Sequence, residues 1–68
     1  MRIMVEKITV TVFVELDDGR KKIGGLIFDN EATAKRTLTE WLNALGTDYP
    51  PERLLANIQR ENSFVDLV

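Results

Sequence analysis

The chain has 68 residues, of which 44% are hydrophobic and 29% are charged, and its formal net charge is −2. This length makes one domain, residues 1–68, and the composition is that of a folded chain rather than a disordered one. Cysteine and histidine are both absent, which excludes disulfides, thiol nucleophiles, and metal sites built on thiolate or imidazole.

The first predicted element is a strand from Ile8 to Leu16. Apolar, mostly β-branched residues occupy every second position, and threonine, phenylalanine and glutamate fill the positions between them. This period of two is typical of a strand with one buried face. A second strand, Ile23–Phe28, is predicted after Asp17-Asp18-Gly19, because an Asp-Gly step between two β-forming runs favours a hairpin.

The register of this hairpin depends on the turn, and two geometries are open. A two-residue Asp18-Gly19 loop pairs Val10 with Ile27. A three-residue loop over 17–19, with a left-handed glycine, pairs Val10 with Leu26 instead. A slip of one residue reverses the face that each side chain of the second strand presents to the core.

Gly24-Gly25 lies in the middle of the second strand, where glycine weakens pairing and often marks a bulge. In the two-residue register, Phe13 lies opposite Gly24 and covers the bare backbone. A bulge at the glycine pair would instead turn Ile23, Leu26 and Phe28 all toward the core.

A helix is predicted from Asp29 or Asn30, either of which suits the N-cap, to about Leu45. Glu31 lies in the first turn, where a negative charge is favourable, and Gly46 is expected to end the helix in a left-handed conformation. The helix carries a single apolar stripe. Its members are Ala34, Leu38, Trp41, Leu42 and Leu45.

The last third of the chain has two interpretations. In the first, Pro50-Pro51-Glu52 begins a short second helix with an apolar inner face of Leu54, Leu55 and Ile58. In the second, Leu55–Arg60 is a strand and Glu61-Asn62 a hairpin turn, but the β propensity of this segment is poor. We favour the helix. Ser63–Val68 is predicted to form a final strand beside the first.

These elements predict an α+β fold in the order ββα, short second helix, final β. One antiparallel sheet of three strands is expected, with the main helix packed on one of its faces. Two glycines without a Lys-Ser/Thr partner do not make a phosphate-binding loop. The carboxylate pair Asp17-Asp18 is explained by turn chemistry, and Asp29 and Glu31 by the start of the helix. We therefore expect no enzyme, no catalytic or metal-binding residue, no cofactor and no small-molecule ligand.

The second strand is apolar on both faces, which predicts an exposed patch on the sheet face opposite the main helix. Phe13, Thr11, Leu26 and Phe28 are the candidate interface residues. Large exposed apolar patches tend to be interfaces. We expect a non-enzymatic protein-interaction module, either a homo-oligomer such as a homodimer or a module for another protein partner. The alternative is that the short helix or the C-terminal segment covers this face.

A nucleic-acid-binding role is the second functional hypothesis, with Arg20, Lys21 and Lys22 contacting phosphates. The simpler interpretation is cross-strand charge pairing, Lys22 with Glu15 and Arg20 with Asp17, in the two-residue register. The acidic balance of the chain favours this simpler interpretation.

A secretion signal is not expected, because Glu6 and Lys7 interrupt the apolar run that follows Arg2. Threonines alternate through Ile8–Val14, which favours a strand over a secretory core. The chain also lacks a run of about 18 apolar residues, so no membrane span is predicted. We expect a cytoplasmic protein without a membrane partner.

Overall fold

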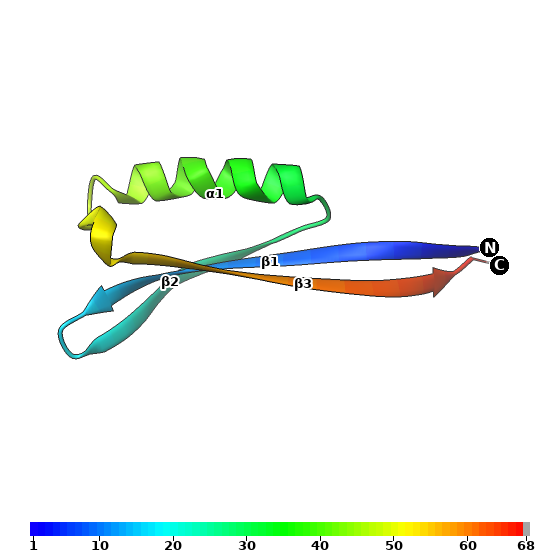
Figure 1. Cartoon of the computed structure of the whole chain (residues 1–68), viewed down its shortest axis with the longest axis horizontal. Helices are drawn as coiled ribbons and strands as arrows, with labels where there is room; N and C mark the ends of the chain where they lie inside the picture. Colours follow the sequence, from blue (N-terminus) through cyan, green and yellow to red (C-terminus); the bar gives the residue numbers. More distant parts are fainter. Residues whose placement is uncertain (68) are drawn as a thin grey trace.

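The computed structural model describes residues 1–67 and has three antiparallel strands, one main helix and one short 3-10 turn. In chain order the elements are β1 (Arg2–Leu16), β2 (Gly19–Phe28), α1 (Glu31–Leu45), the 3-10 turn η1 (Pro51–Arg53) and β3 (Leu54–Asp66). The strands form one open sheet in the order β2-β1-β3, and α1 lies along one side of it (Figure 1). The predicted α+β fold class is confirmed.

The core lies where the alternating side chains of β1 meet α1. Ile8, Val10, Val12 and Val14 are each at most 1% exposed, and Ala34 of α1 is equally buried. Phe28 and Leu38 pack around the part of this core formed by Ile8, Val10 and Ala34. The β-branched residues therefore serve twice, since they favour the extended backbone and also fill the space under the helix.

The hairpin turn consists of Asp17 and Asp18, because Leu16 pairs with Gly19. Neither of the two loops considered from the sequence, Asp18-Gly19 or residues 17–19, is the one observed, and Gly19 follows the turn with a φ of 142°. A positive φ of this kind is a conformation that glycine adopts without steric cost.

An irregularity in the β1–β2 ladder sets the register of the second strand. Val12 pairs with Gly24 and Phe13 with Lys22, so Ile23 has no partner of its own. Beyond this bulge Val10 pairs with Leu26, the pairing expected of the three-residue loop, but the extra residue is Ile23 and not the glycine of the turn.

Gly24 faces α1 rather than Phe13. Its partner Val12 is buried under the helix, and a Cβ atom built on Gly24 would lie 3.2 Å from the ring of Trp41. The prediction that Phe13 covers this glycine was wrong, because the bulge moves Phe13 opposite Lys22. Glycine suits this position because the indole of Trp41 packs against the backbone, and a larger residue would push the ring outward.

The helix begins as expected and ends differently. Asn30 is the N-cap, and its Oδ1 accepts a hydrogen bond from the backbone N–H of Thr33 at 3.1 Å. Gly46 has a φ of −63°, so the predicted left-handed stop was wrong. Instead, the hydroxyl of Thr47 donates to the carbonyl of Ala44 at 2.8 Å and satisfies one of the last helical acceptors.

The predicted second helix is limited to η1, a single 3-10 turn. The residues assigned to its inner face belong to β3, which runs without a turn at Glu61-Asn62 and pairs with β1 from Val14–Leu54 to Arg2–Asp66. The expected place of Ser63 beside β1 was right, while Val68 lies outside the described residues. The hydrogen-bonded pairing with β1 along the whole of β3 outweighs the poor β propensity of its residues. Residue types differ in β propensity by only about 1 kcal/mol.

The sheet is much longer than the helix that covers it. Fifteen residues extend about 50 Å as a strand but only about 22 Å as a helix. As a result, Arg2–Lys7 of β1 and Glu61–Asp66 of β3 continue beyond α1 as a two-stranded ribbon, here called the arm (Figure 1). The molecule measures 52 × 23 × 13 Å, and its radius of gyration of 15.2 Å exceeds the value of about 11 Å for a compact domain of this length.

The substitution Ile8→Val tests the position of the core. It removes one methylene group from a fully buried side chain and is expected to lower the free energy of unfolding by about 0.5–1.5 kcal/mol. Ile27→Val makes the same chemical change at a side chain that is 66% exposed, where less than about 0.5 kcal/mol is expected. Urea unfolding followed by circular dichroism gives both values, and equal losses would place the core elsewhere.

The substitution Gly24→Val tests the contact with Trp41, the only tryptophan of the chain. The new side chain must displace the indole ring, which we expect to move the fluorescence emission to longer wavelength and to cost about 1–3 kcal/mol. Gly25→Val is the matched control, because a Cβ atom there makes only ordinary contacts and none with Trp41. The same emission shift in both variants would contradict the assigned register.

Candidate interaction surface

The sheet face opposite α1 is the main surface that the fold leaves uncovered. Among residues 1–67, no other element is layered on this side of the sheet (Figure 1). Side chains alternate along a strand, so the residues between the buried positions of β1 point to this face. We call it the open face. On β1 it comprises Ile3, Val5, Lys7, Thr9, Thr11, Phe13 and Glu15.

Directly opposed residues of an antiparallel pair share a face, which identifies the rest of the open face. Leu55 lies opposite Phe13 on β3, and Ile27 lies opposite Thr9 on β2. Ile27 is 66% exposed, whereas Phe13 and Leu55 are half-buried. The open face thus has one apolar pair near the hairpin end of β1 and an exposed isoleucine near the middle of the sheet.

The four predicted interface residues do not form one surface. Phe13 and Thr11 lie on the open face, but Leu26 pairs with Val10 and Phe28 with Ile8, which puts both on the face of α1. The prediction that they share a patch was wrong in this respect. The physical reason is the bulge at residue 23, which changes the parity of β2 relative to β1.

Apolar side chains that the sequence interpretation did not single out lie on the arm. Ile3 pairs with Val65 on the open face, and Met4 pairs with Phe64 on the other face. These four side chains are between 41% and 60% exposed, so the arm shows apolar side chains on both faces. Residues 3–5 are consecutive apolar residues without period-two alternation, so the sequence alone does not assign these side chains to faces.

The solvent-accessible area of the molecule is large, in agreement with the uncovered open face and arm. The accessible area is 5172 Å², whereas a folded monomer of this mass exposes about 4,400 Å². The difference of about 800 Å² equals what one partner contributes to a protein–protein interface of standard size.

The basic cluster after the turn is divided between the two faces. Arg20 lies opposite Glu15 and Lys22 opposite Phe13, while Lys21 lies opposite the buried Val14. The expected pairs of Lys22 with Glu15 and of Arg20 with Asp17 were therefore wrong by the register shift. The guanidinium of Arg20 lies 6.0 Å from the centre of the Phe13 ring, at the outer limit of a cation–π contact. The three cations do not form a continuous row on one face.

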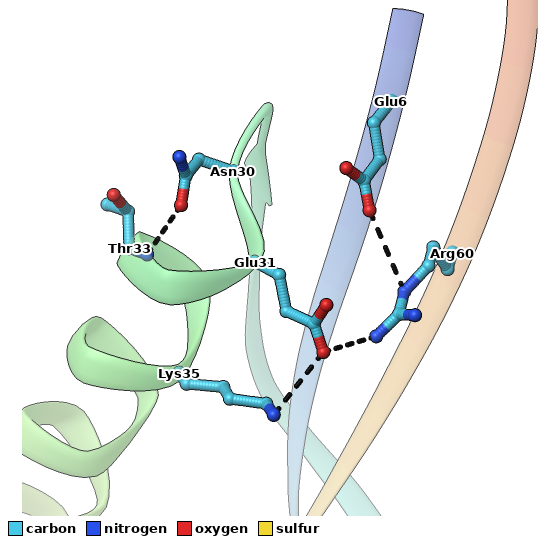
Figure 2. A network of polar contacts seen from close by, with 6 residues as sticks. All are labelled: Glu6, Asn30, Glu31, Thr33, Lys35 and Arg60. Atoms are coloured by element: carbon cyan, nitrogen blue, oxygen red, sulfur yellow. Dashed lines mark hydrogen bonds and ion pairs between the residues drawn. The ribbon is translucent and has the colours of Figure 1, made fainter.

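Charged side chains connect the start of α1 to β1 and β3 at the base of the arm (Figure 2). Glu31 accepts from Arg60 of β3 and lies 3.3 Å from the ammonium of Lys35, one helical turn away. The Nε of Arg60 also lies 3.8 Å from Glu6 of β1. These side chains are 33–67% exposed, so the network positions α1 over the base of the arm more than it stabilises the fold.

Two grooves flank α1, one on each side. The first, of about 510 Å³, lies between Trp41 and the glycines of β2, and Leu26 forms part of its wall. The second, of about 410 Å³, lies between α1 and β3 and is bordered by Ile58 and Arg60. No polar or charged side chain among residues 1–67 is buried, so neither groove contains the desolvated ionisable group that marks many catalytic sites.

Within the described part of the chain, no three Asp or Glu side chains come together as a possible metal site. None of the helices in this part is both long enough and apolar enough to cross a membrane. Comparisons with protein-family models, with curated proteins and with solved structures find no match to this chain.

The substitution Arg60→Gln tests the charged network. It removes the contacts with Glu31 and Glu6, and a loss of about 0.2–1 kcal/mol in the free energy of unfolding is expected because the pairs are partly exposed. The loss should shrink at 1 M salt, where the screening length falls to about 3 Å. Arg36→Gln is the control, since Arg36 makes no ion pair among residues 1–67. A loss that is independent of salt would argue against an electrostatic origin.

Proposed function

We propose that this chain is a non-enzymatic protein-interaction module that self-associates through the open face of its sheet. The observation that carries the proposal is the uncovered face itself, on which Ile27 is 66% exposed and the Phe13–Leu55 pair only half-buried. Covering exposed apolar surface is the dominant favourable term in protein association. A second sheet packs on such a face at about 10 Å, which is the geometry of a sandwich.

The small core supports a self-associating state. Only five hydrophobic residues among the described positions are fully buried, and a domain of this size without disulfides or metal commonly gains stability by association. The surplus of about 800 Å² of accessible surface suits one further contact of standard size. A cytoplasmic location is part of this proposal and agrees with the cysteine-free composition.

The non-enzymatic part of the proposal is supported by the chemistry of the surface. The sequence contains no histidine, which is the commonest general base, and no cysteine, which is the thiol nucleophile of proteins. None of the polar or charged side chains among the described residues is buried.

The alternative, a nucleic-acid-binding role for Arg20, Lys21 and Lys22, receives less support. Lys21 lies on the face of α1 while the other two lie on the open face, and the chain is acidic overall. Phosphate contacts by these residues would make binding strongly dependent on salt.

The substitution Ile27→Lys tests the proposal. It places a charge on the open face without disturbing a buried contact, and it is expected to weaken self-association at least about tenfold, equivalent to about 1.4 kcal/mol. Phe13→Lys should act in the same direction, with an added cost from its contact with Leu55. Sedimentation equilibrium measures the dissociation constants, and Thr39→Lys, on α1 and away from the open face, is the control.

A wild-type chain that stays monomeric at millimolar concentration would overturn the proposal, as would equal association of the wild type and Ile27→Lys. Salt-dependent binding of an oligonucleotide that disappears when Arg20, Lys21 and Lys22 are replaced by alanine would favour the alternative instead.

A further inference from the structure

The arm has a free strand edge on β1. β2 ends at Phe28, which lies opposite Ile8, so the preceding residues of β1 are paired on one side only, with β3. Beyond that point no segment of residues 1–67 lies along the other edge of β1. An unpaired edge presents a row of backbone donors and acceptors that another strand can bind.

The hydrogen-bonding pattern identifies which residues face this edge. Met1 and Leu67 exchange both of their backbone hydrogen bonds, at 2.9 and 2.6 Å, so Met1 points its backbone groups toward the β3 side. In an antiparallel pair the direction alternates along the strand. Arg2, Met4 and Glu6 therefore present their N–H and C=O groups to the free edge.

This edge carries one cation and one anion on either side of an apolar centre. Arg2 and Glu6 flank Met4, whereas the outer edge of β3 in the arm presents Asn62, Phe64 and Asp66, without a cation to complement the aspartate. On β1, three consecutive apolar residues, 3–5, occupy the middle of the free edge without a proline or a charge. An apolar edge of this kind is suited to a partner strand.

We propose that a second copy of the chain pairs with this edge, β1 against β1 in antiparallel orientation, with Met4 opposite the partner's Met4. In this register Arg2 lies opposite the partner's Glu6, and Ile3 lies opposite the partner's Val5. The twofold axis of this dimer passes through the Met4 pair, so the Arg2–Glu6 and Ile3–Val5 contacts each occur twice. The inference rests on the proposed self-association and names the strand that carries it.

Charge complementarity selects this register over its neighbours. A register centred on Arg2 or on Glu6 places two like charges opposite each other, which is unfavourable. A register centred on Ile3 or Val5 removes the direct pairing of Arg2 with the partner's Glu6. Arg2 also lies 3.6 Å from Asp66, so the chosen register continues a row of alternating charge across the strands: Asp66, Arg2, the partner's Glu6 and the partner's Arg60.

The pairing also joins the open faces of the two copies. Ile3 and Val5 point to that face, so each contact between Ile3 and the partner's Val5 adds apolar surface at the centre of a continuous sheet. The two modes of association are therefore compatible, because edge pairing extends the sheet whose open face packs elsewhere.

A charge-exchange experiment tests the register. Arg2→Glu and Glu6→Arg each place like charges opposite one another in the homodimer, and each variant alone should associate about tenfold more weakly or worse. In an equimolar mixture of the two variants, both contacts of the mixed dimer have opposite charges. Association near the wild-type level is expected, and native mass spectrometry detects the mixed species directly. Mixing does not restore any interaction that a substitution removes inside its own chain, so recovery can come only from contacts between chains.

A proline pair tests the edge itself. Met4→Pro removes an N–H that faces the free edge and spares the ladder to β3, so the monomer is retained while pairing is blocked. Asn62→Pro makes the same change on the outer edge of β3 and is the matched control. Circular dichroism confirms that both variants fold, and sedimentation measures their association. The expected result is loss of association for Met4→Pro alone.

The inference is overturned if the mixed charge variants associate no better than either one alone, or if Asn62→Pro abolishes association and Met4→Pro does not. If Ile27→Lys dissociates the protein while every arm variant associates like the wild type, the proposed function stands and the edge pairing fails. A wild-type chain that is monomeric at millimolar concentration removes both.

Discussion

The fold depends on β1 being paired on both sides. Between Ile8 and Leu16 this strand hydrogen-bonds to β2 on one edge, and between Arg2 and Val14 it pairs with β3 on the other. The four buried side chains of β1 form most of the core, and α1 is held against them. No other strand of the described chain has two partners, so β2, α1 and β3 are organised by their contacts with this one segment.

The central position of β1 also explains why side chains are buried in one half of the molecule and exposed in the other. Where three strands and the helix overlap, the inward side chains of β1 are almost fully buried; where only β1 and β3 remain, side chains such as Met4 and Phe64 are more than half exposed. The charged network of Glu31, Arg60 and Glu6 lies at the boundary between these two regions (Figure 2). The fold is thus a small covered domain continued by an uncovered ribbon, and both proposed contacts lie on the surface that this arrangement leaves open.

The sequence predicts the elements whose signals are local. The alternation of β1 and the apolar stripe, cap and length of α1 depend on neighbours within one or two turns, and they were identified correctly. The long β3 was not, because residues such as Asn57 and Gln59 have little β propensity and take their conformation from the ladder with β1. The start of β1 at Arg2 was missed for the same reason, since its partner strand was unknown. The candidate site shows how far one residue changes a prediction: Phe13 and Thr11 were placed correctly opposite the helix, but Leu26 and Phe28 were not. The alternative of a bulge at the glycine pair turned both residues inward, but the choice between a bulge and a straight strand is not a local signal. The bulge lies at Ile23, next to Gly24, whose backbone packs against Trp41, 17 positions along the chain.

The arm joins the two most distant parts of the described chain, since Arg2 pairs with Asp66. Loop-closure entropy makes such distant pairings slow to form relative to hairpins and helices. During synthesis, at roughly 5–20 residues per second, the hairpin and α1 can form on the ribosome while the first residues of β1 wait several seconds for β3. Throughout that interval residues 2–7 have no partner on either edge, so the ribbon that makes the molecule long is the last part of the sheet to be completed.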